Sequence, residues 1–335
     1  MHELRWGLVG AGDIARKRVA AALAGATRSR LVAVCRRDAG RAEEFARRVG
    51  ATRWHADWRD LVRDDAIDAV YVATPVALHA PVTIAAAAAG KHVLCEKPMA
   101  LDVAECDTMI AAAERGGVKL GVAYYRHRYP IVCRMAELLR EGAIGVPVMA
   151  QLEAFERFDP APDHPRAWLL DPSVSGGGPM FDFGCHRLEV LLALFGDVVD
   201  VRGLHANTLF ERPVEDAAVE VLRFSPGPIA IVSVAHAAAE PRDTFHLFGS
   251  EGSLHVPVLN GAALTITSRG ATRTEQHPAP DNLHLPLVQQ FVEAVLDDAP
   301  PVVDGRMGRA VNRLLAAAAG DAAPRRPDYT ARSSK

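Results

Sequence analysis

The chain has 335 residues, of which 49% are hydrophobic and 24% charged, and its net charge is −3. This length exceeds one ordinary domain core and suffices for two, and the composition is that of a soluble globular protein with a well-buried interior. The evenly mixed charges exclude the basic surface that nucleic acids or anionic membranes require, so they favour a small neutral or weakly charged partner.

The cysteines and the apolar runs bear on the redox compartment and on membrane association. Because the cysteines are odd in number, scattered and without C-x-x-C spacing, we expect reduced thiols in the cytoplasm, with no disulfide framework and no bound metal. They are Cys35, Cys95, Cys106, Cys133 and Cys185. No charged leader with an apolar core opens the sequence, and the alanine-rich run at 84–89 is far below spanning length, so we expect no membrane segment.

The first stretch, residues 4–20, reads LRWGLVGAGDIARKRVA and predicts a strand, a glycine-rich turn and a helix. Gly10, Gly12 and Ala15 form G-x-G-x-x-A. Gly10 allows a sharp exit from the strand, Gly12 lets a pyrophosphate approach the backbone, and Ala15 permits close helix packing. The helix N-terminus, with Asp13 and Ile14, offers free N–H groups to phosphates. The motif alone also fits an ordinary tight turn, but its place between a strand and a helix favours a dinucleotide site.

Strands and helices then alternate up to residue 123. We expect strands at 30–35, 52–55, 69–74, 92–95 and 119–123, and helices at 39–49, from 57, at 78–89 and at 102–115. Such alternation predicts a parallel sheet covered on both faces, because each crossover helix returns across the sheet. Residues 1–123 are therefore expected to form an α/β, doubly wound, NAD(P)-binding Rossmann domain.

Beyond residue 123 the alternation of strands and helices gives way to several strands in succession. We expect helices at 130–139, 179–195, 285–296 and 307–319, and strands at 146–158, 198–206, 217–224, 229–237, 244–249, 253–256 and 263–268. Successive strands with short turns predict an α+β domain, residues 124–323, with a large open and mainly antiparallel sheet, followed by a polar tail at 324–335. Residues 229–234 are apolar at both alternating positions, so we expect this sheet to form a homodimer or homotetramer.

Three motifs occur in order along the chain: VGAGDIA at 9–15, ATPVALHA at 73–80 followed by GKHVLCEKPMA at 90–100, and GGGPMFDFGCH at 176–186. In this order and spacing they resemble the glucose-fructose oxidoreductase / inositol dehydrogenase (Gfo/Idh/MocA) family, and the resemblance covers nearly the whole chain. It implies reversible hydride transfer between a nicotinamide cofactor and a secondary alcohol or ketone of a small-molecule sugar, inositol-like polyol or dihydrodiol.

The Glu96-Lys97-Pro98 motif is the sharpest part of the resemblance. Lys97 is expected at the carboxyl end of the fifth strand, where ligands bind in open α/β sheets and an ammonium can meet a substrate oxygen. A plain surface lysine is the structural alternative. The resemblance implies instead that Lys97 is catalytic, and that the Lys97–Pro98 bond is often cis.

Asp182 and His186 stand four residues apart in a predicted helix, so both should project from one face. A carboxylate one turn from an imidazole can fix its tautomer and raise its pKa, although a helix start followed by a buried core histidine would show the same pattern. The resemblance implies that both residues join Lys97 in the catalytic set. His186 is then the acid/base on the substrate oxygen, Lys97 polarises that oxygen, and Asp182 either orients His186 or holds a neighbouring hydroxyl.

The resemblance also places the loop after the fourth strand against the nicotinamide half of the cofactor. This loop contributes Thr74, Pro75 and His79, and Glu96 and Lys97 come from the next strand end. Thr74 is a possible donor, whereas a histidine opening a helix can also be a capping or packing residue.

Aromatic residues near the domain junction are expected to line a polyol pocket. Tyr124 belongs to the polar-aromatic run at 124–129, and Trp168 lies in a proline-rich loop, where tryptophan often only pins the loop down. We expect the substrate to contact both, together with Lys97, Asp182 and His186. The family's run around Arg128 is one residue shorter here, so no role is assigned to Arg126 or Arg128.

The end of the second strand predicts which cofactor is used. An NAD-selective Rossmann domain places an acidic residue there, whereas this chain has the small Cys35 followed by Arg36 and Arg37. Asp38 falls in the turn before the next helix, too late to reach the ribose. Because arginine binds phosphate through paired charge-assisted hydrogen bonds, we predict NADP(H) in preference to NAD(H). Solvated loop arginines are the alternative.

Two other functions fit the same motifs. One is a redox-neutral glycoside hydrolase that keeps NAD bound, and the other is a non-catalytic dinucleotide sensor that reports to a protein partner. A sensor could dispense with a proton-transfer set, whereas this chain keeps Lys97, Asp182 and His186. Dehydrogenase activity is therefore the favoured interpretation.

Overall fold

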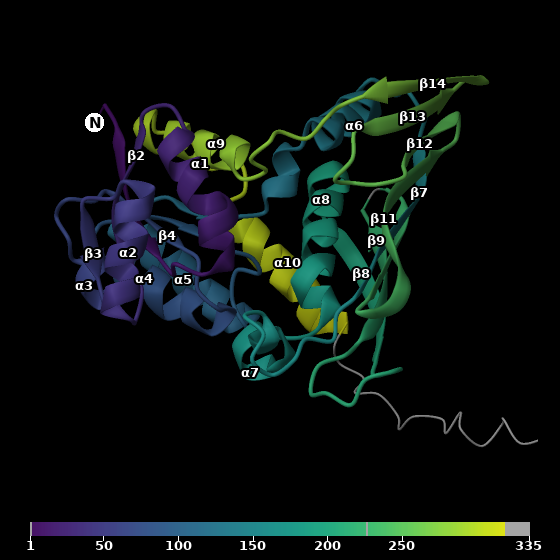
Figure 1. Cartoon of the computed structure of the whole chain (residues 1–335). Helices are drawn as coiled ribbons and strands as arrows, with labels where there is room; N and C mark the ends of the chain where they lie inside the picture. The colour runs from purple at the N-terminus through teal and green to yellow at the C-terminus, as the bar shows by residue number, and fades with distance from the viewer. Residues whose placement is uncertain (1, 226, 319–335) are drawn as a thin grey trace, which may run out of the picture.

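A computed structural model describes residues 2–225 and 227–318 of the chain. These residues form two sheets flanked by helices (Figure 1). The predicted polar tail and the last residue of the predicted final helix lie outside the described residues. Within the described part, no helix is both long and apolar enough to cross a membrane.

The first sheet confirms the predicted Rossmann architecture. Its six described strands are all parallel and follow the order β3-β2-β1-β4-β5-β6, the dinucleotide-binding order. They are β1 (Leu4–Val9), β2 (Ser29–Cys35), β3 (Arg53–His55), β4 (Ala69–Val72), β5 (His92–Cys95) and β6 (Leu120–Val122). The interiors of the central strands are apolar and buried because helices cover both faces, whereas the edge strand β3 is largely exposed.

Aspartate N-caps and a glycine C-cap mark the ends of several crossover helices in this domain. Asp38, Asp57 and Asp102 each accept a backbone hydrogen bond at the start of a helix, and Gly50 ends one in the left-handed region. The helices are η1 (Ala15–Val19, π-helical) running into α1 (Ala20–Gly25), α2 (Ala39–Val49), α3 (Trp58–Val62), the 3₁₀ turn η2 (Val76–Leu78), α4 (His79–Ala88) and α5 (Val103–Gly116).

The second sheet is large and mainly antiparallel, as predicted, with one parallel pair between β10 and β7. Its eight described strands follow the order β14-β13-β12-β11-β7-β10-β9-β8. They are β7 (Pro147–Arg157), β8 (Val198–Ala206), β9 (Ala217–Phe224), β10 (Ile229–Ala235), β11 (Ala237–Gly249), β12 (Gly252–Val256), β13 (Ala263–Ser268) and β14 (Ala271–Gln276). The sequence did not predict β14, whose polar residues lack the apolar alternation of a half-buried strand.

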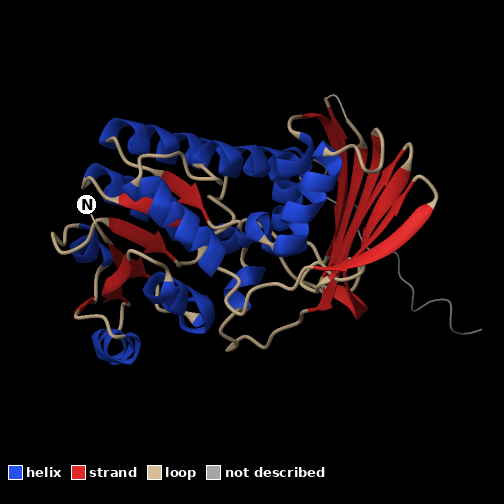
Figure 2. Ribbon diagram, turned by 90° about the horizontal axis from the view of Figure 1, so that it is seen from above, coloured by secondary structure: helices blue, strands red, loops and turns tan. Residues whose placement is uncertain are grey.

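Helices lie against one face of the second sheet, and Figure 2 shows the opposite face without a covering layer. The helices and turns are η3 (Tyr125–Arg128), α6 (Pro130–Arg140), η4 (Ala167–Leu170), α7 (Pro172–Ser175), η5 (Met180–Gly184, π-helical), α8 (Cys185–Phe195), α9 (Leu285–Leu296) and α10 (Gly305–Ala318). The predicted helix at 179–195 is therefore a π-turn running into an α-helix.

The last two helices return to the first domain, although the sequence predicted that they complete the second. Helix α9 packs on α1, and α10 crosses from α5 to α8 (Figure 1). Phe291 of α9 lies on Trp6 with ring centroids 5.6 Å apart, and Val122 donates a backbone hydrogen bond to Val303 at 2.9 Å. The chain thus closes the core of its first domain with its C-terminal helices, which joins the two units.

Candidate active site

The glycine-rich turn after β1 leaves room for a ligand on its open side. Gly10 has φ +99°, and a Cβ there would stand 2.4 Å from the carbonyl oxygen of Ala73, so only glycine fits. A Cβ on Gly12 would meet nothing within 4 Å, so backbone is exposed there. The hydroxyl of Thr74 next to this turn is buried and has no hydrogen-bond partner in the described residues. This arrangement fits a dinucleotide pyrophosphate and nicotinamide.

The two residues after Gly12 begin the helix and turn their side chains away from the open side. The Asp13 carboxylate pairs with Lys17 at 2.8 Å and Arg16 at 3.1 Å, one turn along the same helix. Ile14 packs against the apolar core. Their contribution to a bound phosphate is therefore the backbone at the helix N-terminus rather than the side chains.

The end of β2 carries a guanidinium to this same turn. Arg36 donates from Nη1 to the carbonyl oxygen of Ala11 at 3.3 Å, while Arg37 is exposed. Asp38 caps α2 by accepting from the Arg41 backbone at 3.0 Å, as its expected place in the turn implied. Cys35 is buried, and burial raises its thiol pKa to about 12, so this side chain is neutral.

His79 and Glu96, both expected at the cofactor, are committed to other partners. His79 is buried, with Nε2 3.0 Å from the carbonyl oxygen of Thr74 and Nδ1 2.9 Å from that of Pro98. Since both ring nitrogens face carbonyl oxygens, this residue links the two strand-end loops, and its contact with the cofactor stays a prediction. Pro75 begins η2 beside it.

The buried carboxylate of Glu96 is held by three groups. It accepts from the Tyr71 hydroxyl at 2.8 Å and the Lys97 backbone at 3.2 Å, and lies 3.3 Å from Nε2 of His284. Burial raises the pKa of Glu96, but His284 and Lys97 outweigh it and keep the pKa below its ordinary value. This carboxylate anchors the loop, and its contact with the cofactor stays a prediction.

Lys97 follows β5, and its bond to Pro98 is cis, as the resemblance implied. Its Nζ donates to the carbonyl oxygen of Asp182 at 2.5 Å and lies 3.4 Å from Oδ1 of the same residue. Burial lowers the pKa of Lys97, but the acidic groups around it, Cys185 and Asp182 foremost, outweigh burial and raise it. The structure therefore supplies a charged, positioned ammonium at the carboxyl edge of the sheet.

Asp182 is surrounded by two cationic side chains and a histidine, which come from distant segments. Oδ2 accepts from Nη2 of Arg166 at 2.9 Å and lies 3.7 Å from Nε2 of His236, while Oδ1 faces Lys97. Burial raises the pKa of this carboxyl, but Lys97, His236 and Arg166 outweigh it and hold the pKa far below its usual value. Asp182 is therefore ionised.

The expected contact between Asp182 and His186 does not form. Among the described residues neither ring nitrogen of His186 has a hydrogen-bond partner, and Nδ1 is fully shielded. Asp182 lies in the π-turn η5, whose wider turn displaces residues four apart from the single face that an α-helix would give them. The structure thus does not support Asp182 as the orienter of His186, and its role in holding a neighbouring hydroxyl stays a prediction.

His186 stands in an aromatic pocket and is 1% exposed. Its ring lies edge-on to Tyr125 at 4.8 Å and to Tyr124 at 5.6 Å between centroids. Burial, followed by the charges of Arg126 and Lys97, lowers its pKa well below the ordinary value. The sequence-based expectation of a raised pKa is therefore wrong, and His186 is a neutral imidazole near pH 7.

The predicted pocket aromatics differ in their placement. Tyr124 is completely buried beside His186, whereas Tyr125, from the same polar-aromatic run, lies between His186 and His284. Trp168 is half-buried on η4, in the same loop that brings Arg166 to Asp182. That loop therefore reaches the catalytic set, and substrate contact by Trp168 stays a prediction.

Glu156, Asp182 and His236 offer atoms of metal-ligand type within 4.8 Å of one another. Arg166 already lies 2.9 Å from Asp182 and 3.7 Å from Glu156, and Lys97 faces the other side of Asp182. Arg166 and Lys97 thus neutralise the carboxylates of this cluster, as a bound metal ion would otherwise have to do.

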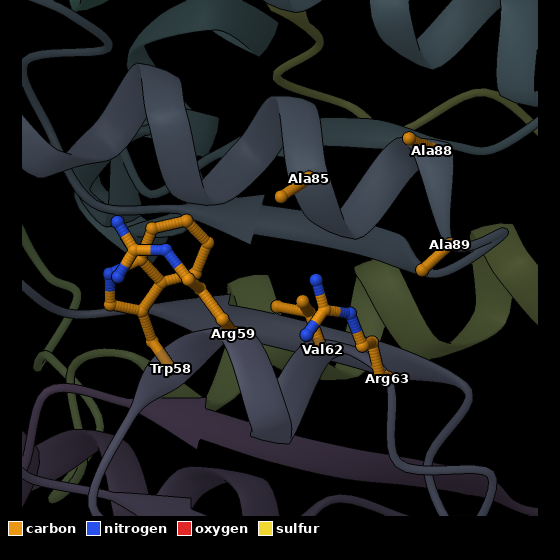
Figure 3. A pocket seen from close by; sticks show the side chains of 7 residues that line it. All are labelled: Trp58, Arg59, Val62, Arg63, Ala85, Ala88 and Ala89. Atoms are coloured by element: carbon orange, nitrogen blue, oxygen red, sulfur yellow. The ribbon is translucent and has the colours of Figure 1, made fainter.

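One groove in the described surface lies away from the residues around Lys97. Figure 3 shows the groove between α3 and α4, of about 380 Å³, with Trp58 stacked under Arg59 and small alanines opposite. It has no contact with Lys97 or the glycine-rich turn, and its lining contains no catalytic pair. The residues gathered around Lys97 are therefore the candidate active site.

Two site residues escaped the sequence-based reasoning. Arg166 and His236 contact Asp182 from positions 16 and 54 residues away. No local motif surrounds Arg166 or His236, so only the fold could bring them to the site. Tyr125, which contacts His186, belongs to the polar-aromatic run that the sequence placed at the pocket.

The family comparisons agree along most of the chain. The family model described as "Oxidoreductase family, NAD-binding Rossmann fold" (GFO_IDH_MocA) matches residues 4–124, and the GFO/IDH/MocA C-terminal domain model matches residues 132–255. The 1,5-anhydro-D-fructose reductase of Ensifer adhaerens is 32% identical over 309 residues, which cover 91% of this chain and 92% of that protein.

Two further relatives bear on the cofactor. The D-xylose 1-dehydrogenase [NADP(+)] of Haloarcula marismortui is 31% identical over 262 residues, covering 76% of this chain and 72% of that protein. A structure of levoglucosan dehydrogenase in complex with NADH matches with a TM-score of 0.87 and 25% identity, covering 94% of this chain and 95% of that one. Both nicotinamide cofactors thus occur among proteins similar to this chain.

Proposed function

Because the chain belongs to the GFO/IDH/MocA family of oxidoreductases, we propose that Lys97, Asp182 and His186 form the catalytic set of an NAD(P)-dependent dehydrogenase or reductase. The enzyme acts on the CH–OH group of a sugar, polyol or dihydrodiol. The observation that carries this proposal is the charged Lys97 ammonium at the carboxyl edge of the first sheet, beside ionised Asp182 and neutral His186.

The residues divide the work by charge. A bound nicotinamide would supply the hydride acceptor for oxidation of the carbinol and the hydride donor for reduction of the carbonyl. Lys97 polarises the substrate oxygen and lowers its proton affinity, and neutral His186 takes the hydroxyl proton in the oxidative direction. Asp182, held by Arg166 and Lys97, keeps the ammonium in place and accepts from a neighbouring hydroxyl. Thr74, with its unpartnered hydroxyl, is the donor toward the cofactor.

A substrate panel of sugars, polyols and dihydrodiols with NADP or NAD, read by the absorbance of reduced nicotinamide, tests this function. Steady cofactor reduction or oxidation is expected. Product formation without net cofactor turnover would indicate the redox-neutral hydrolase, and cofactor binding without reaction would indicate the sensor.

NADP(H) is the proposed preferred cofactor. The support is the position of Arg36 over the glycine-rich turn, through its hydrogen bond to Ala11, and the commitment of Asp38 to capping α2. A ribose 2′-phosphate at the end of β2 would meet a guanidinium there rather than a carboxylate.

The proposed assembly is a homodimer, or a homotetramer built from it, formed through the bare face of the second sheet. Leu204 is 75% exposed on this face and lies opposite Val219, while Val221 and Ile229 are exposed further along β9 and β10. Exposed apolar residues of this kind on one sheet face favour burial against a second copy. The five free cysteines support a reducing, cytoplasmic location.

A further inference from the structure

A cavity of about 170 Å³ lies between α8, with the turn before it, and strands β7 and β11 of the second sheet. Three guanidiniums and two carboxylates stand in its wall. These groups are Arg126, Arg187, Arg242, Glu156 and Asp243, with Phe155 and Phe183 among the apolar lining.

Two of the three guanidiniums have anionic partners. Arg187 donates to the Asp243 carboxylate and, at 2.7 Å, to the carbonyl oxygen of Phe183. Arg242 pairs with Glu240 at 2.9 Å on the exposed rim. Glu156, the other carboxylate of the wall, lies 3.7 Å from Arg166, so the positive charge left without a partner among these groups is that of Arg126.

Arg126 is 7% exposed and has no carboxylate within ion-pair distance among the described residues. Its one hydrogen bond in that part of the chain goes to the neutral hydroxyl of Tyr125, at 3.3 Å, and its Nε is buried without a partner. The Tyr125 ring under the guanidinium, 5.2 Å from its centroid, offsets only part of the cost of burial. A buried cation normally has a matching anion, because desolvation otherwise disfavours it.

The cavity adjoins the catalytic set. Glu156, in its wall, has a carboxylate oxygen within 4.8 Å of the ligand atoms of Asp182 and His236. Arg187 directly follows His186 on α8, and the Phe183 ring in the wall lies 5.0 Å from that of His236. A group held by Arg126 would thus belong to the same molecule whose carbinol meets Lys97 and His186.

We infer that this cavity receives a carboxylate of the substrate through the guanidinium of Arg126, so that the enzyme prefers an acidic sugar, such as a uronic or aldonic acid, over its neutral counterpart. The inference rests on the proposed function, since it names the substrate class of that site. A monoanion balances the single charge of Arg126, and the planar guanidinium matches a carboxylate through two parallel hydrogen bonds. A phosphate dianion would exceed that charge beside Glu156 and Asp243.

Matched pairs of substrates test the inference. D-glucuronate against D-glucose, D-galacturonate against D-galactose and D-gluconate against D-glucitol are compared by kcat/KM with the preferred cofactor. The acidic member should be favoured about ten- to a hundredfold, and Arg126→Gln should remove that preference by lowering kcat/KM for the acidic member far more than for the neutral one. Arg126→Lys keeps the positive charge but loses the two parallel hydrogen bonds of the guanidinium. Its preference for the acidic member should therefore lie between those of the wild type and Arg126→Gln. Arg128→Gln, at an exposed position two residues along, is the matched control.

Binding without turnover separates this inference from the proposed function. The midpoint of thermal unfolding, measured with each sugar and saturating cofactor, should rise more with the acid than with its neutral partner, and Arg126→Gln should abolish the difference. If no substrate is turned over but the acid still stabilises the protein selectively, the proposed activity is wrong and the carboxylate site stands. Equal stabilisation by both members of every pair, or equal effects of Arg126→Gln on both, would overturn the carboxylate site itself.

Discussion

The cofactor edge of the first sheet and the substrate side between the two sheets are built in different ways. At the cofactor edge the determinants are backbone and short motifs, such as Gly10, Gly12 and the Arg36 contact with Ala11. On the substrate side, one carboxylate, Asp182, contacts side chains from three separate segments. The difference teaches that dinucleotide binding is encoded locally, whereas the charge pattern that handles the substrate depends on the whole fold.

The largest expected effect is a loss of turnover from a change on the substrate side, with cofactor binding retained. Lys97→Met should abolish turnover, by about a thousandfold or more, because the ammonium acts mainly on charge that develops in the transition state. Cofactor affinity should stay within about tenfold, since the glycine-rich turn is untouched. Steady-state kinetics and cofactor fluorescence titration measure the two effects. An unchanged turnover number would show that Lys97 is not catalytic.

His186→Ala tests whether the buried imidazole carries the proton. The rate should fall by about a hundredfold or more. Because burial lowers the pKa of His186, the neutral base should persist as the pH drops below about 6.5, and the oxidative rate should decline only when the pH falls through that lowered pKa. The opposite reaction, which needs the protonated form, should gain as the pH falls.

The control for this variant is the pH profile itself. The acidic limb of kcat/KM should disappear in His186→Ala while the folded state, followed by circular dichroism, is kept. If the limb persists in the variant, another group carries the proton.

Arg36→Ala breaks the cofactor edge instead. NADP affinity should weaken about ten- to a hundredfold, because a charge-assisted contact to the 2′-phosphate is lost, while NAD affinity changes much less. Titration of both cofactors against wild type and variant measures the split, with Arg41→Ala, on the exposed side of α2, as the control. Equal weakening for both cofactors, or a wild-type preference for NAD, would contradict the proposed role of the strand end.

The smallest expected effect on turnover comes from the bare face of the second sheet. Val221→Glu combined with Leu204→Glu should convert the dimer to a monomer at micromolar concentration, because charges would replace apolar contacts, while each active site keeps its residues. Light scattering gives the mass, and Trp54→Glu, exposed on the edge strand of the first sheet, is the control. A monomeric wild type would refute this interface.

The sequence by itself determined the first domain almost completely. Its strands follow from short apolar runs, its helix ends from Asp caps and a Gly stop, and its turn from glycines whose positions permit no Cβ or leave space for a ligand. These are properties of neighbouring residues, so they can be recognised without coordinates. The same holds for Lys97, whose place after β5 follows from the strand pattern.

Only the tertiary structure decided the chemistry around Asp182 and His186. The pattern D-x-x-x-H predicted a pair on one helix face, but the π-turn at Met180–Gly184 separates them, and Arg166 and His236 take the carboxylate instead. The lowered pKa of His186 and the commitment of His79 and Glu96 likewise come from burial and distant partners. Desolvation and long-range charge depend on what the fold packs around a group, and no local spacing encodes them.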